Sequence, residues 1–78
     1  MIKVYTKNNC PFCDQAKSLL ESKGKMYISV NIEENESEKE FLIDQGLRSV
    51  PQIFKDGILI PGGFQGLAGK PEEFWTTL

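Results

Sequence analysis

Histidine is absent from this chain of 78 residues, and cysteine occurs only twice. A mononuclear structural zinc site needs four ligands, usually cysteine and histidine, so the sequence argues against such a site within one chain. Long apolar runs are absent as well, since none is longer than Ile58-Leu59-Ile60. We therefore expect no membrane span, no secretory signal and a cytoplasmic location.

An excess of positive charge is also lacking, because the net charge is −2 and the pI is near 5.0. A basic surface is the usual footprint of proteins that bind nucleic acid or anionic membranes, so neither partner is expected. A chain of this length is expected to form a single domain with a small core, over residues 1–78. We interpret the acidic run from Glu33 to Glu40 as a solvated face that also favours a helix N-terminus.

The two cysteines, Cys10 and Cys13, lie where a predicted strand runs into a predicted helix. Residues three apart on a helix share a face, so a reversible disulfide needs little backbone distortion. As a cross-link it would add only about 2 kcal/mol, because the closed loop is short. Pro11 suits the first helical position and places Cys10 at the cap, where N–H groups favour a thiolate. Lys7 adds positive charge nearby, so we interpret the pair as a redox dithiol with Cys10 as nucleophile.

Apolar periodicity predicts alternating strands and helices. The expected strands are 2–6, 27–32, 52–55 and 58–60. The expected helices are 11–23, 35–46 and 71–78, and the second of them begins at Asn35 and ends at Gly46. On the first helix, Cys13, Ala16 and Leu20 form the face packed on the sheet, which leaves Cys10 open to a partner.

Local signals refine three of these elements. Asn35 and Glu38 resemble a capping box at the start of the second helix. Asp56-Gly57 predicts a tight hairpin between the last two strands. Near the C-terminus, Phe64–Ala68 is expected to form a separate turn, and Trp75 is expected to belong to the core.

Two segments resemble those of one known family. The run Val4–Leu20, which contains Cys10-Pro11-Phe12-Cys13, resembles the active-site segment of glutaredoxins. Ser49–Phe54, followed by Gly62-Gly63, resembles a second segment of these proteins. The resemblance implies an α/β thioredoxin fold with the order βαβαββα, in which a four-stranded mixed sheet is flanked by helices.

The resemblance also implies a binding site around the dithiol. In glutaredoxins the proline that matches Pro51 is cis and faces the dithiol, so the backbone of Val50 is free to pair with an extended peptide. The other residues implied to contact the substrate are Lys7, Pro11, Phe12, Lys39, Arg48, Gly63, Phe64 and Gln65. The glycines suit a close approach of substrate to backbone, although turn geometry alone would also explain Gly62-Gly63.

The function implied by the resemblance is a dithiol–disulfide oxidoreductase coupled to glutathione. Such an enzyme reduces protein disulfides and protein–glutathione mixed disulfides through a Cys10–Cys13 thiol/disulfide cycle. It is expected to be a monomer without a permanently bound cofactor, and glutathione is its reducing co-substrate.

Two alternatives remain open. Many glutaredoxins have Asp where this chain has Gln65, and a neutral amide cannot supply the charge that pairs with the glutathione ammonium. The first alternative is therefore a glutaredoxin-like hydrogen donor for ribonucleotide reductase that is recharged by thioredoxin reductase. The second is an iron–sulfur cluster carrier, in which Cys10 from two chains and two glutathiones hold the cluster. Family members specialised for that role usually have Gly in place of Pro11 and Ser in place of Cys13.

Overall fold

The computed structural model describes all residues from 1 to 78 and contains one four-stranded sheet. Its strands are β1 (Ile2–Thr6), β2 (Tyr27–Asn31), β3 (Gln52–Lys55) and β4 (Ile58–Ile60), in the order β2-β1-β3-β4. β1 pairs parallel with β2 and antiparallel with β3, and β3 pairs antiparallel with β4. The sheet is therefore mixed, as the resemblance to glutaredoxins implies.

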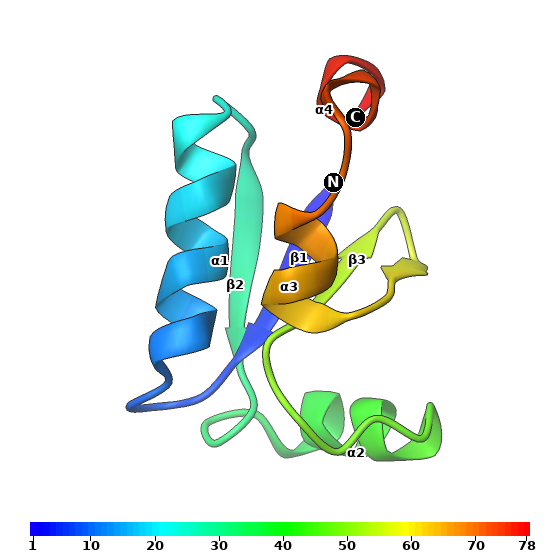
Figure 1. The fold of residues 1–78 in the computed structure, drawn as a ribbon. Helices are drawn as coiled ribbons and strands as arrows, with labels where there is room; N and C mark the ends of the chain where they lie inside the picture. Colours follow the sequence, from blue (N-terminus) through cyan, green and yellow to red (C-terminus); the bar gives the residue numbers. More distant parts are fainter.

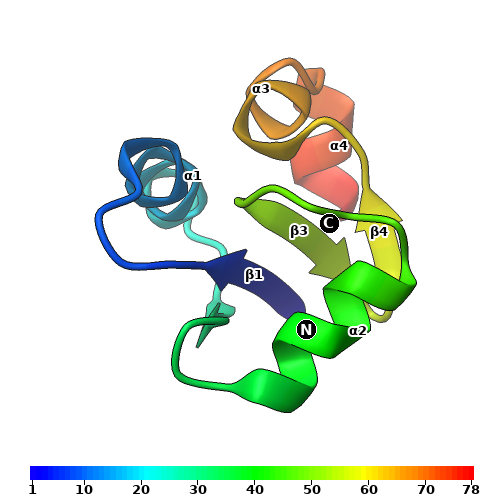
Figure 2. The same cartoon turned by 90° about the horizontal axis from the view of Figure 1, so that it is seen from below.

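Four helices cover the sheet on both faces. They are α1 (Pro11–Ser22), α2 (Glu36–Asp44), α3 (Gly63–Ala68) and α4 (Glu72–Thr77). Figure 1 shows α1 beside the sheet and α2 below it, and the turned view in Figure 2 shows α1 and α3 on one face with α2 on the other. The fold is thus a sheet between two helical layers.

The larger core lies between the sheet and the layer of α1, α3 and α4. Its eight buried residues are Ile2, Val4, Ala16, Leu20, Ile53, Ile60, Leu67 and Trp75. Ala16 and Leu20 belong to the predicted packed face of α1, and Cys13 on that face is fully buried too. Trp75 is also buried as predicted, so α4 closes this core from the C-terminal end of the chain.

The smaller core lies under α2 and contains Tyr5, Leu42 and Phe54. The ring of Tyr5 meets that of Phe54 edge-on, with the ring centroids 5.5 Å apart. Its hydroxyl donates a hydrogen bond of 3.0 Å to Oε1 of Glu38 on α2. Glu38 therefore connects α2 to β1, one of the two inner strands of the sheet.

Only one half of the predicted capping box is present. Oδ1 of Asn35 accepts the N–H of Glu38 at 3.4 Å, as an N-cap does. The Glu38 carboxylate turns instead toward the sheet, where it accepts from Tyr5 and lies 3.7 Å from Nζ of Lys3. The competing partners on β1 explain why the reciprocal bond to Asn35 is not made.

The C-terminal part differs most from the sequence prediction. Residues 64–68, expected to be a turn, belong to the helix α3, so the element order is βαβαββαα. Helix α3 contains Gly63 and Gly66, which have low helix propensity, and this composition hides the helix in the sequence. The hairpin at Asp56-Gly57 is confirmed, with positive φ values of 51° and 82°.

The sheet topology brings two distant segments together. Tyr5 near the end of β1 lies opposite Gln52 at the start of β3, because the two strands are antiparallel. The loop after β1, which leads to Cys10, and the loop before β3, which contains Val50-Pro51, therefore meet at one end of the sheet. None of the helices is both long enough and apolar enough to cross a membrane.

Candidate active site

Cys10 is the cap residue of α1, as its position before Pro11 predicts. Its backbone is extended, with φ −121° and ψ 95°, and its sulfur accepts the N–H of Cys13 at 3.2 Å. The carbonyl of Cys10 accepts the N–H of Asp14 at 3.1 Å, which is the first hydrogen bond of the helix. The sulfur of Cys10 thus lies at the positive end of α1 and accepts one backbone N–H there, a position that favours a thiolate.

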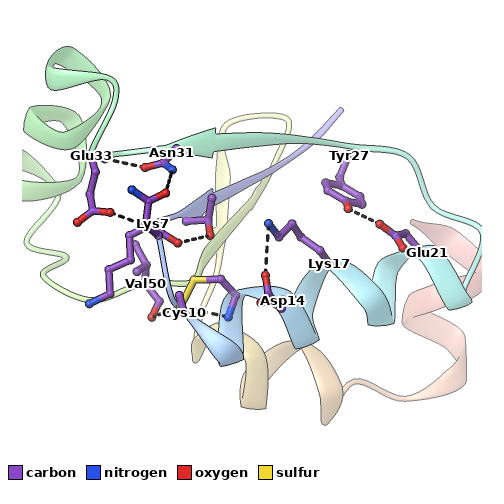
Figure 3. Close-up of polar contacts among 12 residues, drawn as sticks. Lys7, Cys10, Asp14, Lys17, Glu21, Tyr27, Asn31, Glu33 and Val50 are labelled. Carbon is purple, nitrogen blue, oxygen red and sulfur yellow. Dashed lines mark hydrogen bonds and ion pairs between the residues drawn. A yellow bond between two sulfur atoms is a disulfide. The ribbon is translucent and has the colours of Figure 1, made fainter.

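Cys10 and Cys13 form a disulfide in the structure (Figure 3). Cys13 is completely buried, in agreement with its place on the packed face of α1. Cys10 is only 8% exposed, so the expectation that it is left open to a partner is wrong for this oxidised state. Its sulfur is covered because it is bonded to Cys13 and lies against the loop that contains Val50.

That loop faces the disulfide across a short gap. Sγ of Cys10 lies 4.0 Å from the carbonyl oxygen of Val50, and a disulfide sulfur has no proton to donate, so this is a contact rather than a hydrogen bond. The Val50–Pro51 peptide bond is cis, as the resemblance implies. The side chain of Gln52 holds the loop, since Nε2 donates to the carbonyl of Ser49 at 2.9 Å and to its hydroxyl at 3.3 Å. Gln52 is 7% exposed, so its amide anchors this loop from within the protein.

A hollow of about 330 Å³ opens beside the cis proline. Its walls include six of the residues expected to contact a substrate, namely Phe12, Val50, Pro51, Gly63, Phe64 and Gln65. Gly62 of the predicted glycine pair also lines this hollow, and sequence reasoning missed the other wall residues, which are Leu47, Ser49, Gln52, Leu59 and Pro61. The rings of Phe12 and Phe64 stack with their centroids 6.1 Å apart, so they form one aromatic wall from α1 to α3. Pro11 lies exposed at the start of α1, next to this wall.

The Gly62-Gly63 pair shapes the junction between β4 and α3. Both glycines have positive φ, at 96° and 59°, a region that side chains other than glycine seldom adopt. A Cβ on Gly63 would lie 3.0 Å from the carbonyl oxygen of Pro51. The turn and its close approach to the cis-proline loop therefore account for the glycines without a ligand.

A second hollow of about 340 Å³ lies on the other side of Val50. It brings together Lys7, Lys39 and Arg48, the three cations expected to contact a substrate carboxylate. Glu33 shares this hollow, although the sequence assigned it to a solvated acidic face. The two hollows have Ser49 and Val50 in common, so the predicted site residues form two groups on either side of one loop.

The groups with shifted pKa values lie away from both hollows. Burial and a hydrogen bond to Glu38 raise the pKa of Tyr5 to about 12. A hydrogen bond to Glu21, with some burial, raises the pKa of Tyr27 to about 12. A hydrogen bond from the N-terminal amine and another from Lys55 lower the pKa of Asp56. The structure gathers no three histidine, cysteine or acidic side chains into a candidate metal site.

Comparison with known proteins links this arrangement to a family. The glutaredoxin family model matches residues 2–60. Glutaredoxin 3 of Escherichia coli (strain K12) is 42% identical over 62 residues, which cover 78% of this chain and 75% of that protein. The glutaredoxin-like protein NrdH of Lactococcus lactis subsp. cremoris (strain MG1363) is 36% identical over 62 residues, covering 80% of this chain and 86% of NrdH.

A solved structure is similar in fold as well as in sequence. The glutaredoxin-like NrdH-redoxin of Escherichia coli superposes with a TM-score of 0.75 and 26% identity, covering 90% of this chain and 95% of that one. The family model includes the cysteine pair, the cis proline and all four strands of the sheet. The chain therefore belongs to the glutaredoxin family of redox proteins.

Proposed function

We propose that this chain reduces protein disulfides and protein–glutathione mixed disulfides and is recharged by glutathione. The observation that carries the proposal is the Cys10–Cys13 disulfide at the N-terminus of α1, facing the carbonyl of Val50 between two hollows. A reversible dithiol needs one sulfur at a surface that a partner disulfide can approach. The second sulfur must lie next to the first, so that it can attack the mixed disulfide. The buried Cys13 suits the second role.

The reduction of a protein disulfide then follows in two exchanges. The Cys10 thiolate attacks one sulfur of the substrate, which forms a mixed disulfide and releases the other sulfur as a thiolate that takes up a proton. Cys13, as a thiolate, next attacks the Cys10 sulfur, which closes the Cys10–Cys13 disulfide and releases the second substrate thiol. Two electrons pass from the dithiol to the substrate, and the structure corresponds to the oxidised end of the cycle.

Recharging reverses these exchanges with two molecules of glutathione. The thiolate of the first glutathione attacks Cys10, which releases Cys13 and leaves a glutathionyl group on Cys10. The second glutathione removes that group as glutathione disulfide. In the proposed complex, Lys7, Lys39 and Arg48 attract the glutathione carboxylates from one hollow, and Gly63, Phe64 and Gln65 border the γ-glutamyl end in the other. Val50 offers its backbone between them.

A second candidate is a hydrogen donor recharged by thioredoxin reductase, with ribonucleotide reductase as its substrate. The 36% identity to NrdH of Lactococcus lactis favours it, as does the likeness to NrdH-redoxin of Escherichia coli, whose structure is described in terms of a thioredoxin-like activity profile. Two side chains in the hollows favour it as well. Gln65 has no charge for the glutathione ammonium, and Glu33 places a negative charge beside the cations expected to bind the carboxylates.

The electron source separates the two candidates. Oxidised protein is mixed with NADPH and either glutathione plus glutathione reductase or thioredoxin reductase alone, and the consumption of NADPH is followed with a disulfide substrate present. Rapid turnover with glutathione is expected. Turnover with thioredoxin reductase and none with glutathione would replace the first proposal with the second.

A further inference from the structure

The loop between β1 and α1 carries the nucleophile, and side chains from a different part of the chain hold it. This loop consists of Lys7, Asn8 and Asn9, and Asn9 has a positive φ of 55°, which is uncommon for a residue other than glycine. Cys10 follows directly. A loop with such a conformation needs contacts that maintain it, because the backbone alone does not favour it.

Two hydrogen bonds to Asn8 supply these contacts, and a third joins the two residues that make them. Oε1 of Glu33 accepts the backbone N–H of Asn8 at 2.8 Å. The side-chain amide of Asn31 donates to Oδ1 of Asn8 at 2.9 Å, and Oδ1 of Asn31 accepts the N–H of Glu33 at 2.9 Å. Figure 3 shows Asn31 at the end of β2 and Glu33 just after it, both turned toward the loop that leads to Cys10. Each of the three residues thus contacts both others.

This network lies at the end of the paired strands β1 and β2. The N–H of Ile32 donates to the carbonyl of Thr6 at 2.9 Å, which extends the parallel pairing of β1 and β2 up to the loop. Beyond the loop, Cys10 begins α1. Asn8 is therefore the point at which the end of β2 and the residues just after it can fix how the chain passes from the sheet to the nucleophile.

From this geometry we infer that Glu33 and Asn31 are positioning residues for Cys10. They hold Asn8 so that the Cys10 sulfur stays at the N-terminus of α1, where it accepts the N–H of Cys13. The inference rests on the proposed role of Cys10 as nucleophile. Glu33 then has two opposite effects on Cys10. Its hydrogen bond to Asn8 positions the loop, whereas its negative charge disfavours a nearby thiolate.

The charge and the hydrogen bond of Glu33 can be separated by substitution. Glu33→Gln removes the charge but keeps a side-chain oxygen that accepts the N–H of Asn8. Glu33→Ala removes both. If the hydrogen bond positions the loop, the two variants differ in the reactivity of the Cys10 thiol. If only the charge matters, both variants change that reactivity in the same direction and by the same amount.

The experiment measures the alkylation rate of Cys10 by iodoacetamide as a function of pH, with reduced protein in a Cys13→Ser background. We expect Glu33→Gln to alkylate at neutral pH as fast as the parent or faster. We expect Glu33→Ala to alkylate roughly threefold more slowly, as suits the loss of an exposed hydrogen bond. Its pH profile should move to higher pH. Equal rates in the two variants, or no change in either, would overturn the inference.

Asn31→Ala gives an independent test within the same network. It should also slow alkylation of Cys10, and the double variant Asn31→Ala with Glu33→Ala should be no slower than the slower single variant, because both act through Asn8. Fully additive effects would contradict a shared network.

The same measurement separates this inference from the proposed function. Alkylation needs neither glutathione nor a reductase, so it reports on the sulfur whichever electron source is used. If the parent Cys10 shows no alkylation at neutral pH, the proposed nucleophile is wrong. If the parent reacts but the variants behave alike, only the positioning role is wrong.

Discussion

Cys10 and Cys13 are three residues apart, yet their surroundings differ in ways that assign them different tasks. Cys13 is completely buried on the packed face of α1, whereas Cys10 is 8% exposed and its sulfur lies 4.0 Å from the carbonyl oxygen of Val50. These surroundings suit the proposed order of attack, in which Cys10 reacts with an incoming disulfide and Cys13 acts on the bond then formed to Cys10.

Substitution of the two cysteines should therefore have unequal effects. Cys10→Ser is expected to abolish all thiol transfer, because no other sulfur is placed to make the first attack on a substrate disulfide. Cys13→Ser should lose reduction of protein disulfides but keep part of the deglutathionylation activity, since Cys10 alone can take a glutathionyl group. Activity assays with a disulfide peptide and a glutathionylated peptide check both results. Equal losses of both activities in the two variants would contradict these roles.

Tyr5 is the second residue whose environment leads to a measurable effect. Burial and the hydrogen bond to Glu38 raise its pKa to about 12, from an ordinary value of 10.0. Because the folded-state pKa is the higher one, the stabilisation linked to Tyr5 is fully present below about pH 10. It is lost as the pH rises from about 10 to about 12.

Phenolate absorbance in the oxidised protein measures this shift, since disulfide-bonded cysteines do not titrate. Tyr27 has a raised pKa too, so the Tyr27→Phe variant isolates the signal of Tyr5. Its absorbance should rise with a midpoint near pH 12 while the protein remains folded. A midpoint near pH 10 would show that the phenol is accessible to water. The slope of unfolding free energy against pH in this range should be smaller in Tyr5→Phe than in the parent.

At the scale of elements, the junction between β4 and α3 leaves no room for a side chain at Gly66. A Cβ on Gly66 would lie 1.9 Å from the carbonyl oxygen of Pro61, which is far inside van der Waals contact. Alanine is a better helix former than glycine by about 1 kcal/mol, so propensity alone favours Gly66→Ala. The clash outweighs this gain, because the neighbouring atom belongs to the backbone and cannot rotate away.

Gly66→Ala is therefore expected to lower the free energy of unfolding by about 2 to 3 kcal/mol. Gly69→Ala is the matched control: its Cβ would lie 3.3 Å from the carbonyl oxygen of Gln65, and its φ of −82° suits alanine. Urea denaturation of both variants measures the difference. Similar stabilities would mean that α3 can move away from Pro61 at little cost.

The elements that the sequence predicted well are those with local signals. Pro11 after Cys10, Asn35 before α2 and Asp56-Gly57 in the hairpin each act within a few residues of their own position. Helix α3 was missed because its glycines are required by contacts with Pro51 and Pro61, which lie outside the helix. Helix propensity cannot find a helix whose residues are selected by close contacts with other segments.

The features of the site also fall into those that local sequence predicts and those that depend on distant segments. The dithiol and its cap follow from local sequence, whereas the cis geometry of Val50-Pro51 followed only from the family resemblance. Glu33 was interpreted as a solvated acid because its partners, Asn8 and Asn31, approach it only after β1 and β2 have paired. Gln52 was missed for a similar reason, since its contact with Ser49 depends on how the loop before β3 folds back.

At the scale of the molecule, the disulfide and the two cores make separate contributions to stability. The cores lie on opposite faces of the sheet and include α4 through Trp75, which is 6% exposed and is the single tryptophan of the chain. The disulfide closes a loop with a sequence separation of only 3. By chain entropy such a short loop contributes about 2 kcal/mol.

Reduction of the disulfide should therefore leave the protein folded and only modestly less stable. We expect urea unfolding, followed by Trp75 fluorescence, to give an unfolding free energy at most about 2 kcal/mol lower for the reduced protein than for the oxidised one. Cys13→Ser serves as the control, because its stability should not respond to reductant. A loss of more than twice that size, or unfolding on reduction alone, would mean that the dithiol supports the fold and is not free to cycle between its two states.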